Sequence, residues 1–381
     1  MTATLARVEA HVLRTPIKEP VRTSFGTMTE RAAVFVRVED SDGARGWGEI
    51  WCNFPNAAAE HRALLFADIL APRVLGKSLD DPVALWAELD RALHVLRIQS
   101  GDPGAFSAAA AGLDLAVHDL RARKRGLPLW RALGGTDDSP VPIYASGINP
   151  GRAAFDTVER TREAGYRAFK IKVGFGEETD LASLRPVAQS LKADERLMVD
   201  ANQAWDVREA CRMAPRLAEL GLGWIEEPLL ADRPLAEWTQ VAAVAPTTIA
   251  AGENMRGVGQ FQDAIDSGVF GILQPDAAKW GGHSGCLPVA KAALAAGRSY
   301  CPHYLGGAIG LLHSLHLLAA VRGPGLLEVD ANPNPLREGL LSDVFAIANG
   351  SVALPGGQGL GLEPDLKPLL NFRSLHLERH A

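Results

Sequence analysis

The feature that most constrains the fold of this chain is the alternation, in its second half, of short apolar runs with longer stretches of helical pattern. Repeated strand–helix units of this kind form an α/β fold, either a closed barrel or an open, doubly wound parallel sheet. The predicted strands are Val141–Ala145, Ala168–Val173, Leu197–Asp200, Trp224–Glu227, Thr248–Ala251, Ile272–Gln274, Ser299–Pro302 and Leu326–Val329.

Polar residues close nearly every one of these runs. A barrel collects the carboxyl ends of all its strands at one mouth, whereas an open sheet uses only the few ends at its switch point. The pattern therefore favours a TIM-like barrel over an open sheet.

The first part of the chain has a different pattern, that of a small α+β unit. Between its first two strands, the polar stretch 16–30 predicts an irregular, mobile loop that closes over a site. An Asp81-Pro82 pair predicts a helix with Asp as N-cap and Pro at the first helical position. The predicted strands are Val8–Leu13, Ala32–Val38 and Arg45–Glu49, and two further helices are predicted over Ala57–Leu75 and Ala105–Lys124.

Glycine, proline and aspartate cluster over 134–140 and predict a domain boundary. We expect residues 1–135 to form the α+β domain and residues 136–350 to form the barrel with the active site. Residues 351–381 are expected to pack back on the first domain.

The composition excludes several function classes. A formal net charge of −6 gives no reason to expect a nucleic acid or an anionic membrane as a partner. The sequence has no signal-peptide pattern, and its apolar runs are too short to span a bilayer. The scattered cysteines form no CxxC pair, which is typical of reduced thiols, so we expect a cytoplasmic protein. These cysteines are Cys52, Cys211, Cys286 and Cys301.

The second barrel strand carries two lysines, Lys170 and Lys172, between apolar residues and before Gly174. Side chains two apart on a strand share a face, so the two ammonium groups point the same way. In a buried strand, repulsion and desolvation would both lower the lysine pKa values and make a base near neutral pH. The alternative is an edge strand with two solvated lysines.

Acidic residues close the next three strands: Asp200, Glu226 and Glu253. Three carboxylates that converge at a barrel mouth repel one another unless a cation lies between them. Ligation by oxygen alone selects a hard ion, Mg²⁺ first and Mn²⁺ second. Any one of these residues alone could instead be a helix N-cap. Glu227 is adjacent to Glu226 and is expected to face elsewhere.

The last strands add Asp276, His303 and Glu328. A histidine on one strand and an aspartate on the preceding one suggest a dyad in which the carboxylate raises the basicity of the imidazole. Glu328 is either a buried structural acid or a protonated acid that donates a hydrogen bond to a developing enolate. Two bases and a metal at one mouth suit removal of a proton α to a carboxylate, through an enediolate that the cation stabilises.

With these motifs the chain resembles the enolase superfamily, specifically its mandelate racemase subgroup. The resemblance implies a (β/α)7β barrel with an N-terminal capping domain that the C-terminal tail completes. It also implies Mg²⁺ at the three carboxylates, Lys172 as one base helped by Lys170, His303 with Asp276 as the other, and Asn202 and Glu328 on the substrate. Muconate-lactonizing relatives place a lysine where Asp276 stands, and Lys279 is not its equivalent. The motifs are Lys170-Ile171-Lys172, Val199–Gln203, Trp224–Pro228, Gly252–Asn254, Gln274–Asp276 with Gly281-Gly282, His303 and Glu328.

Within the subgroup, residues 172–178 and 332–335 look closer to acid-sugar enzymes, including galactarolactone cycloisomerase-like proteins. The resemblance therefore implies an acid-sugar dehydratase or lactone cycloisomerase, acting on a small carboxylate as a homo-oligomer. The alternatives are a racemase or epimerase of a 2-hydroxy acid and a metal-binding homologue without catalysis. Substrate choice is expected to lie with Arg22, Ser24 and Phe25 in the first loop, and with Trp51, Asn53 and Phe54 after the hairpin.

Overall fold

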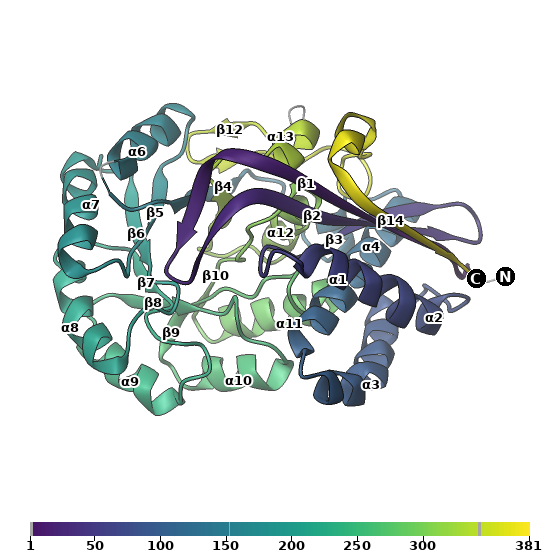
Figure 1. The fold of residues 1–381 in the computed structure, drawn as a ribbon, viewed down its shortest axis with the longest axis horizontal. Helices are drawn as coiled ribbons and strands as arrows, with labels where there is room; N and C mark the ends of the chain where they lie inside the picture. Colours follow the sequence, from purple (N-terminus) through teal and green to yellow (C-terminus); the bar gives the residue numbers. More distant parts are fainter. Residues whose placement is uncertain (1–2, 152, 342–343) are drawn as a thin grey trace.

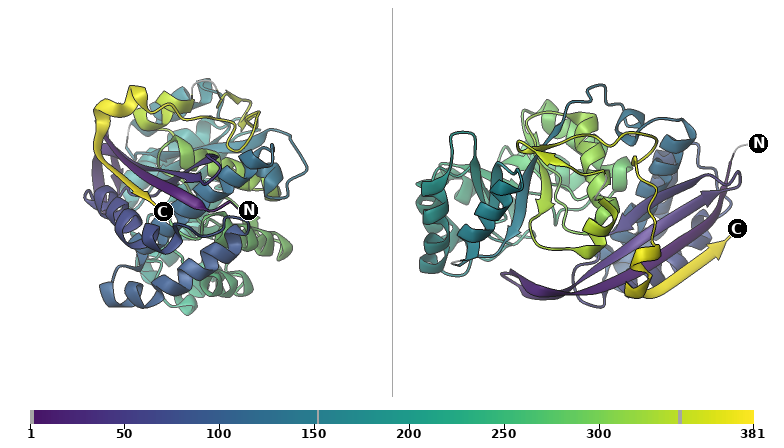
Figure 2. Two further views of the ribbon diagram at one scale, coloured as in Figure 1. Left: turned by 90° about the vertical axis from the view of Figure 1, so that its right-hand side faces the viewer. Right: turned by 90° about the horizontal axis from the view of Figure 1, so that it is seen from above.

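The computed structural model describes residues 3–151, 153–341 and 344–381, which form two sheets (Figure 1). The first sheet is antiparallel and has the strand order β14-β1-β2-β3. Its strands are β1 (Leu5–Thr23), β2 (Gly26–Asp40), β3 (Arg45–Ile50) and β14 (Arg373–His380). The C-terminal strand thus pairs with the N-terminal one, as the yellow and purple ribbons of Figure 2 show.

Alternation along β1 and β2 turns one face of this sheet toward the helices that follow, while Leu13, Ala33 and Phe35 on the other face belong to the larger core that includes the barrel. Val8, Ala10 and Val12 of β1 join the valines of β2 in a core shared with the helices that follow. Helix α4 (Pro103–Lys124) lies so close to β3 that a Cβ added at Gly46 or Gly48 would fall 2.2 Å from a helix carbonyl oxygen. Only glycine permits this approach, which fixes the helices on the sheet.

The helices of this unit agree with the sequence. In α3 (Pro82–Ser100) the Asp81 side chain accepts a hydrogen bond from the Ala84 N–H, so the predicted cap is confirmed. The helix predicted over 57–75 is also confirmed, because residues 58–74 are helical without a break. Its middle part, just before Pro72, has π-helical hydrogen bonding. The three parts are α1 (Ala58–Leu64), η1 (Leu65–Leu70) and α2 (Ala71–Val74).

The prediction of an irregular loop over 16–30 is wrong, because β1 and β2 continue through it as a hairpin. Its outer rungs pair Val21 with Met28 and Thr23 with Gly26, after a register shift beyond Pro16. Val21 and Met28 are buried, although the residues around them are polar. The hairpin reaches from the first sheet toward the barrel strands, with Ser24 and Phe25 at its tip (Figures 1 and 2).

The second sheet carries the predicted strand–helix repeat. Each strand from β4 to β10 pairs in parallel with the next, and β11 returns to pair in parallel with β4. This return makes the sheet a barrel rather than an open sheet. The strands are β4 (Val141–Ile148), β5 (Ala168–Lys172), β6 (Arg196–Asp200), β7 (Trp224–Glu226), β8 (Thr248–Ala251), β9 (Phe270–Leu273), β10 (Ser299–Tyr300) and β11 (Leu327–Asp330).

Helices follow the strands and cover the barrel (Figure 1). Within the described residues no ladder joins β10 to β11, but the Leu326 N–H donates to Cys301 Sγ at 3.4 Å across that gap. The helices are α6 (Ala153–Glu163), α7 (Glu177–Ser190), α8 (Val207–Ala218), α9 (Leu235–Val244), α10 (Val258–Asp266), α11 (Gly282–Ala295) and α12 (Ala308–Val321).

A layer of buried side chains fills the barrel interior below the strand ends. Each strand, or the residue next to it, contributes one member: Tyr144, Ala168, Met198, Trp224, Ala250, Ile272, Cys301 and Leu326. Because side chains alternate along a strand, Lys170 and Lys172 stand on the same inward face as Ala168, one and two steps closer to the mouth. The layer therefore forms the floor of any site at that mouth.

The remaining elements connect the barrel to the first sheet. Strand β13 (Ser351–Val352) pairs with β4 and with β12 (Ile347–Ala348). Helix α13 (Pro335–Leu341) precedes these two strands, and the 3₁₀ segment η2 (Lys367–Phe372) follows them and leads to β14. A short helix, α5 (Leu129–Ala132), precedes the barrel. No helix in the described part of the chain has the length and apolarity needed to cross a membrane.

Candidate active site

A cavity of about 240 Å³ lies between the barrel mouth and the β1–β2 hairpin. Its walls come from two sources that are distant in the sequence. Of the site residues predicted from the sequence, the barrel contributes Lys172, Asn202, Glu253, His303 and Glu328, and the first domain contributes Phe25, Trp51 and Asn53. Lys170, Asp200 and Asp276 are buried and contact Glu328, Lys172 and His303, respectively, from behind. Glu226 is also buried and pairs with Lys170.

Lys170 is fully enclosed within the barrel. Its Nζ lies 2.5 Å from Glu226 Oε1 and 2.8 Å from Glu328 Oε1, and 5.2 Å from the centre of the Tyr144 ring. Burial lowers the pKa of Lys170, but the charges of Glu226 and Glu328 outweigh it and hold that pKa well above its usual value. The predicted lowering of this pKa is therefore wrong for the present arrangement.

Lys172 lies one step closer to the mouth and lines the cavity. The β5–β6 register places it beside Asp200, whose Oδ2 lies 2.6 Å from its Nζ. Burial lowers the pKa of Lys172, yet the Asp200 carboxylate raises it further, and the net pKa lies above its usual value. The sequence predicted a lowered pKa because it does not show which strand pairs with β5. The neighbouring strand β6 supplies the negative charge of Asp200, which raises the pKa of Lys172. Lys172 becomes a base only when the charge of Asp200 is balanced by another partner.

The carboxylates of Asp200, Glu226 and Glu253 stand on consecutive strands or just beyond them, and Asp200 is the direct neighbour of Glu226 in the β6–β7 register. Each one is turned toward a basic side chain. Asp200 faces Lys172, Glu226 faces Lys170, and Glu253 Oε2 lies 3.0 Å from His303 Nε2. Like charges separate and pair with the nearest cations, so the three groups do not converge on one point in this structure.

The donor set nevertheless fits a hard divalent cation. All three groups are carboxylates, and those of Asp200 and Glu226 are buried. The pKa of Glu226 is raised to about 7, first by burial and then by the Asp200, Glu328 and Glu253 carboxylates, against the effect of Lys170. This excess of buried negative charge is what a divalent cation would balance.

His303 and Asp276 form the dyad expected from their strands. Asp276 Oδ2 accepts a hydrogen bond from His303 Nδ1 at 2.7 Å, and Asp276 Oδ1 accepts from the Ala278 N–H at 2.7 Å. The imidazole is thereby held with Nε2 directed at Glu253. Burial lowers the pKa of His303, but Glu253 and Glu328 outweigh it, so the net pKa lies well above its usual value.

Glu328 lies between Lys170 and the cavity. Its Oε1 accepts from Ser146 Oγ at 2.5 Å, and its Oε2 accepts from the Tyr304 N–H at 2.9 Å. Burial raises the pKa of Glu328, but Lys170 and His303 lower it to a net value of about 2. In this arrangement Glu328 is an ionised carboxylate, not the protonated acid that the sequence allowed.

Two of the residues predicted to contact substrate, Arg22 and Ser24, are not among the described residues that line the cavity. Alternation along the hairpin exposes the Arg22 side chain, while its backbone N–H donates to Asn149 Oδ1 at 3.0 Å. Ser24 Oγ donates to the Asn202 carbonyl at 2.7 Å and so ties the hairpin tip to the barrel. Phe25, the third predicted substrate contact in this loop, lines the cavity.

The sequence reasoning did not assign Lys279 to the site, although it lines the cavity. Its Nζ lies 2.9 Å from Asn254 Oδ1, 3.4 Å from Glu253 Oε1 and 4.5 Å from the centre of the Trp51 ring. One sequence signal could have found Lys279. It stands three residues after Asp276, in the turn just beyond the end of β9, and strand ends meet at the barrel mouth. Glu227, which was expected to face elsewhere, is buried and accepts two hydrogen bonds from Asn254 Nδ2 at 2.9 and 3.0 Å.

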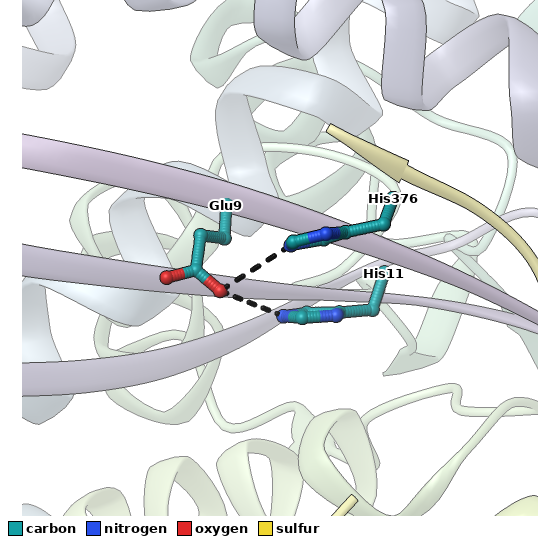
Figure 3. A group of neighbouring side chains, drawn as sticks. All are labelled: Glu9, His11 and His376. Carbon is teal, nitrogen blue, oxygen red and sulfur yellow. Dashed lines mark hydrogen bonds and ion pairs between the residues drawn. The ribbon is translucent and has the colours of Figure 1, made fainter. Parts of the chain in front are cut away.

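A second cluster of potential metal ligands joins Glu9, His11 and His376 on the first sheet (Figure 3). Among the described residues it is the only group of three or more such side chains whose ligand atoms lie within 4.8 Å of one another. The two imidazoles are cross-strand neighbours stacked 4.5 Å apart at 14°, so one ion cannot lie in both ring planes. Arg7 and Arg37 also pair with Glu9. The geometry favours a contact that holds β14 to β1.

Comparison with known proteins adds to this geometry. The model described as Enolase C-terminal domain-like matches residues 153–368, and the N-terminal domain of the mandelate racemase / muconate lactonizing enzyme family matches residues 7–134. D-galactarolactone cycloisomerase of Agrobacterium fabrum (strain C58) is 31% identical over 384 residues, covering 97% of this chain and 98% of that protein. Further relatives are named as dehydratases, racemases and epimerases.

Solved structures agree with these matches. A mandelate racemase/muconate lactonizing enzyme from Bordetella bronchiseptica RB50 is 50% identical with a TM-score of 0.90, covering 97% of this chain and 99% of that one. A racemase from Streptomyces coelicolor A3(2) with bound magnesium is 28% identical with a TM-score of 0.85, covering 97% and 99%. The two domain models, the named relatives and the solved structures thus agree, and the chain is a lyase or isomerase that belongs to the mandelate racemase subgroup of the enolase superfamily.

Proposed function

We propose that this chain removes the α-proton of a sugar acid or of its lactone and then expels a β-leaving group, as a dehydratase or a lactone cycloisomerase. The observation that carries the proposal is that Lys172 and the His303–Asp276 pair, from different barrel strands, line one cavity. A base must lie within hydrogen-bond reach of the proton that it takes.

The residues divide into three roles. Lys172 Nζ removes the proton, and Lys170 lies behind it, neutralising Glu226 and Glu328. His303 Nε2, with its orientation fixed by Asp276, delivers a proton to the departing oxygen as the Cβ–O bond breaks. The enol that forms then takes up a proton to give a 2-keto product. Asp200, Glu226 and Glu253 would hold Mg²⁺, which when bound supplies positive charge that stabilises the enediolate.

The names of the relatives support the substrate class, because they include a galactarolactone cycloisomerase and a talarate/galactarate dehydratase. Mn²⁺ has the same preference for oxygen ligands and is expected to substitute for Mg²⁺. The hairpin and the Trp51–Phe54 segment would set substrate choice, since they form the wall of the cavity opposite the barrel.

A second candidate is a racemase or epimerase of a 2-hydroxy acid. The observation that favours it is again the pair of basic side chains at one cavity, because two bases could deliver a proton to either face of the planar intermediate. Relatives named as an N-succinylamino acid racemase and an L-Ala-D/L-Glu epimerase are consistent with this alternative.

A panel of acid sugars and their lactones in D₂O with Mg²⁺, followed by NMR, separates these functions. A 2-keto product supports the dehydratase or cycloisomerase, whereas inversion at Cα with solvent deuterium and no keto product supports the racemase. If no carboxylate in the panel exchanges its α-proton, both proposals fall and a metal-binding homologue without catalysis is favoured.

A further inference from the structure

The wall of the cavity that faces the barrel mouth is largely aromatic. Phe25 from the hairpin tip, Trp51 and Phe54 from the segment after β3, and Leu305 after β10 all line it. The Phe25 and Phe54 rings lie edge to face, with centroids 5.0 Å apart at 69°. Phe25 is nevertheless 58% exposed. An exposed aromatic side chain at the mouth of a cavity is a ready contact surface for a bound molecule.

The polar side chains in this wall are already engaged. Asn53 Nδ2 donates to the Leu305 carbonyl at 2.6 Å, and Thr23 Oγ1 donates to the Gly26 carbonyl at 3.0 Å. On the barrel side, Gln203 Oε1 accepts from the Ala231 N–H at 2.8 Å. These groups hold the loops in place, which leaves the apolar surfaces as the main contacts offered by this wall.

None of the described residues that form this wall is a cation. Lys279 belongs to the barrel side, where its ammonium donates to Asn254 Oδ1 at 2.9 Å and lies 4.5 Å from the centre of the Trp51 ring. Lys172 and His303 are also on the barrel side, where the proposed reaction uses them. Arg22, close to the hairpin tip, is exposed and is not among the described residues that line the cavity.

We infer that the substrate carries one free carboxylate and that its far end is uncharged and presents a C–H face, as the ring of a sugar-acid lactone does. An open-chain dicarboxylate would bring its second charge against Phe25, Phe54 and Leu305 with no partner, and desolvating an unpaired charge is costly. The inference rests on the proposed function and selects, among its substrates, the lactone over the open diacid.

The first test compares the 1,4-lactone of an aldaric acid with the open aldarate, by initial rates of α-proton exchange in D₂O. The lactone is expected to have a kcat/KM at least about tenfold higher, the ratio that one well-buried ring contact provides. An equal or higher kcat/KM for the open aldarate would overturn the inference.

Variants of Phe25 sharpen this test, because the side chain is at an exposed tip and contributes little to the core. Phe25→Arg supplies the missing cation and should shift the preference toward the open aldarate by about tenfold or more. Phe25→Leu keeps an apolar surface and should retain the lactone preference. Leu370→Arg adds the same charge at an exposed position in η2, distant from the cavity in sequence, and should change nothing.

A binding measurement separates failure of the inference from failure of the proposed function. Calorimetric titration in the presence of Mg²⁺ compares the binding affinity of tetrahydrofuran-2-carboxylate with that of glutarate. Neither compound needs to react for its binding to be measured. Tighter binding of the ring monoacid supports the inference even if no acid sugar is turned over, in which case only the proposed function fails. Tighter binding of glutarate overturns the inference even if acid sugars are turned over.

Discussion

Protons at the two candidate bases are held by neighbouring carboxylates. The Lys172 ammonium pairs with the Asp200 carboxylate, and His303 Nε2 pairs with the Glu253 carboxylate. Both pKa values are raised in this arrangement. A group that keeps its proton is an acid rather than a base, so catalysis requires that the carboxylates find another partner. The three carboxylates proposed as Mg²⁺ ligands include both of these, which links metal binding to the freeing of the bases.

The first prediction concerns these two side chains. Lys172→Ala should lose α-proton exchange for the configuration at Cα that it faces, and His303→Asn for the opposite one, because each base reaches one face of the substrate. With the configuration that Lys172 deprotonates, His303→Asn should still exchange the α-proton but form no 2-keto product, because the acid for the departing oxygen is missing. The expected loss is about 10²–10⁴-fold, the usual contribution of a positioned base. The measurement is deuterium incorporation by NMR with both enantiomeric series. If both variants exchange the same configuration at undiminished rates, neither residue is the base.

A second prediction at this scale concerns the metal. Glu226→Gln should weaken Mg²⁺ binding, because the amide keeps the shape of the side chain but removes one negative charge from the ligand set. Calorimetric titration measures the affinity, and circular dichroism checks that the fold is retained. Asp276→Asn is the matched control, since it makes the same change at a buried residue that contacts His303 and is not a proposed ligand. Equal Mg²⁺ affinity in Glu226→Gln and the wild type would contradict the assignment.

At the scale of elements, the β1–β2 hairpin is the part of the first domain that reaches the barrel mouth. It is tied down at several points. Ser24 Oγ donates to the Asn202 carbonyl, Asn149 Nδ2 donates to the Pro20 carbonyl at 3.2 Å, and the buried Arg31 Nη2 lies 2.6 Å from Asp330 Oδ2. The two hydrogen bonds near the tip contribute about 1 kcal/mol each, so the tip can open at modest cost while the buried Arg31–Asp330 pair holds the base of the hairpin.

The third prediction follows from these contacts. Ser24→Ala should raise KM several-fold with a smaller effect on kcat, because about 1 kcal/mol of lid closure is lost. Steady-state kinetics and limited proteolysis of the hairpin measure the change. Arg22→Ala is the matched control, since its exposed side chain does not line the cavity and its bond to Asn149 comes from the backbone. A larger effect of Arg22→Ala than of Ser24→Ala would contradict this prediction and support a contact between Arg22 and substrate.

At the scale of the whole molecule, buried neutral histidines join the first domain to the barrel. His313 Nε2 on α12 donates to the Trp47 carbonyl of β3 at 2.8 Å, and its Nδ1 lies 2.8 Å from His283 Nε2. His316 accepts from the Trp130 N–H and donates to the Leu360 carbonyl, both at 3.2 Å. Burial lowers the pKa of His313 to about 3 and that of His316 to about 4.

The fourth prediction is that stability falls in acid because of these histidines. Below the unfolded-state pKa of about 6.5, the unfolded chain binds protons that the folded chain does not, so the free energy of unfolding decreases as pH falls from 6.5 toward the folded pKa. His316 contributes about 1.4 kcal/mol per pH unit across this window. Urea denaturation between pH 7.5 and pH 4.5 measures it. His316→Gln, which can accept from Trp130 and donate to Leu360, should lose stability less steeply, and an unchanged slope would contradict the prediction.

The sequence by itself determined the barrel and most of the site's membership. Alternating short apolar runs and helical stretches are local patterns, and they set the strands on which Lys172, Asp200 and Glu226 lie. Strand ends that share a mouth bring His303 to the same cavity. Because these features depend on spacing along the chain, they can be deduced without knowing which strand pairs with which.

Only the tertiary structure decided what those residues do to one another. Pairing of β5 with β6 places Asp200 against Lys172 and reverses the expected direction of the pKa shift. The polar stretch 16–30 folds into a hairpin because its two halves pair as antiparallel strands. Side chains alternate along these strands, so Arg22 points away from the cavity, whereas Phe25 at the tip lines it. These outcomes depend on partners distant in the sequence, whose charge, register and facing direction are fixed only when the chain packs.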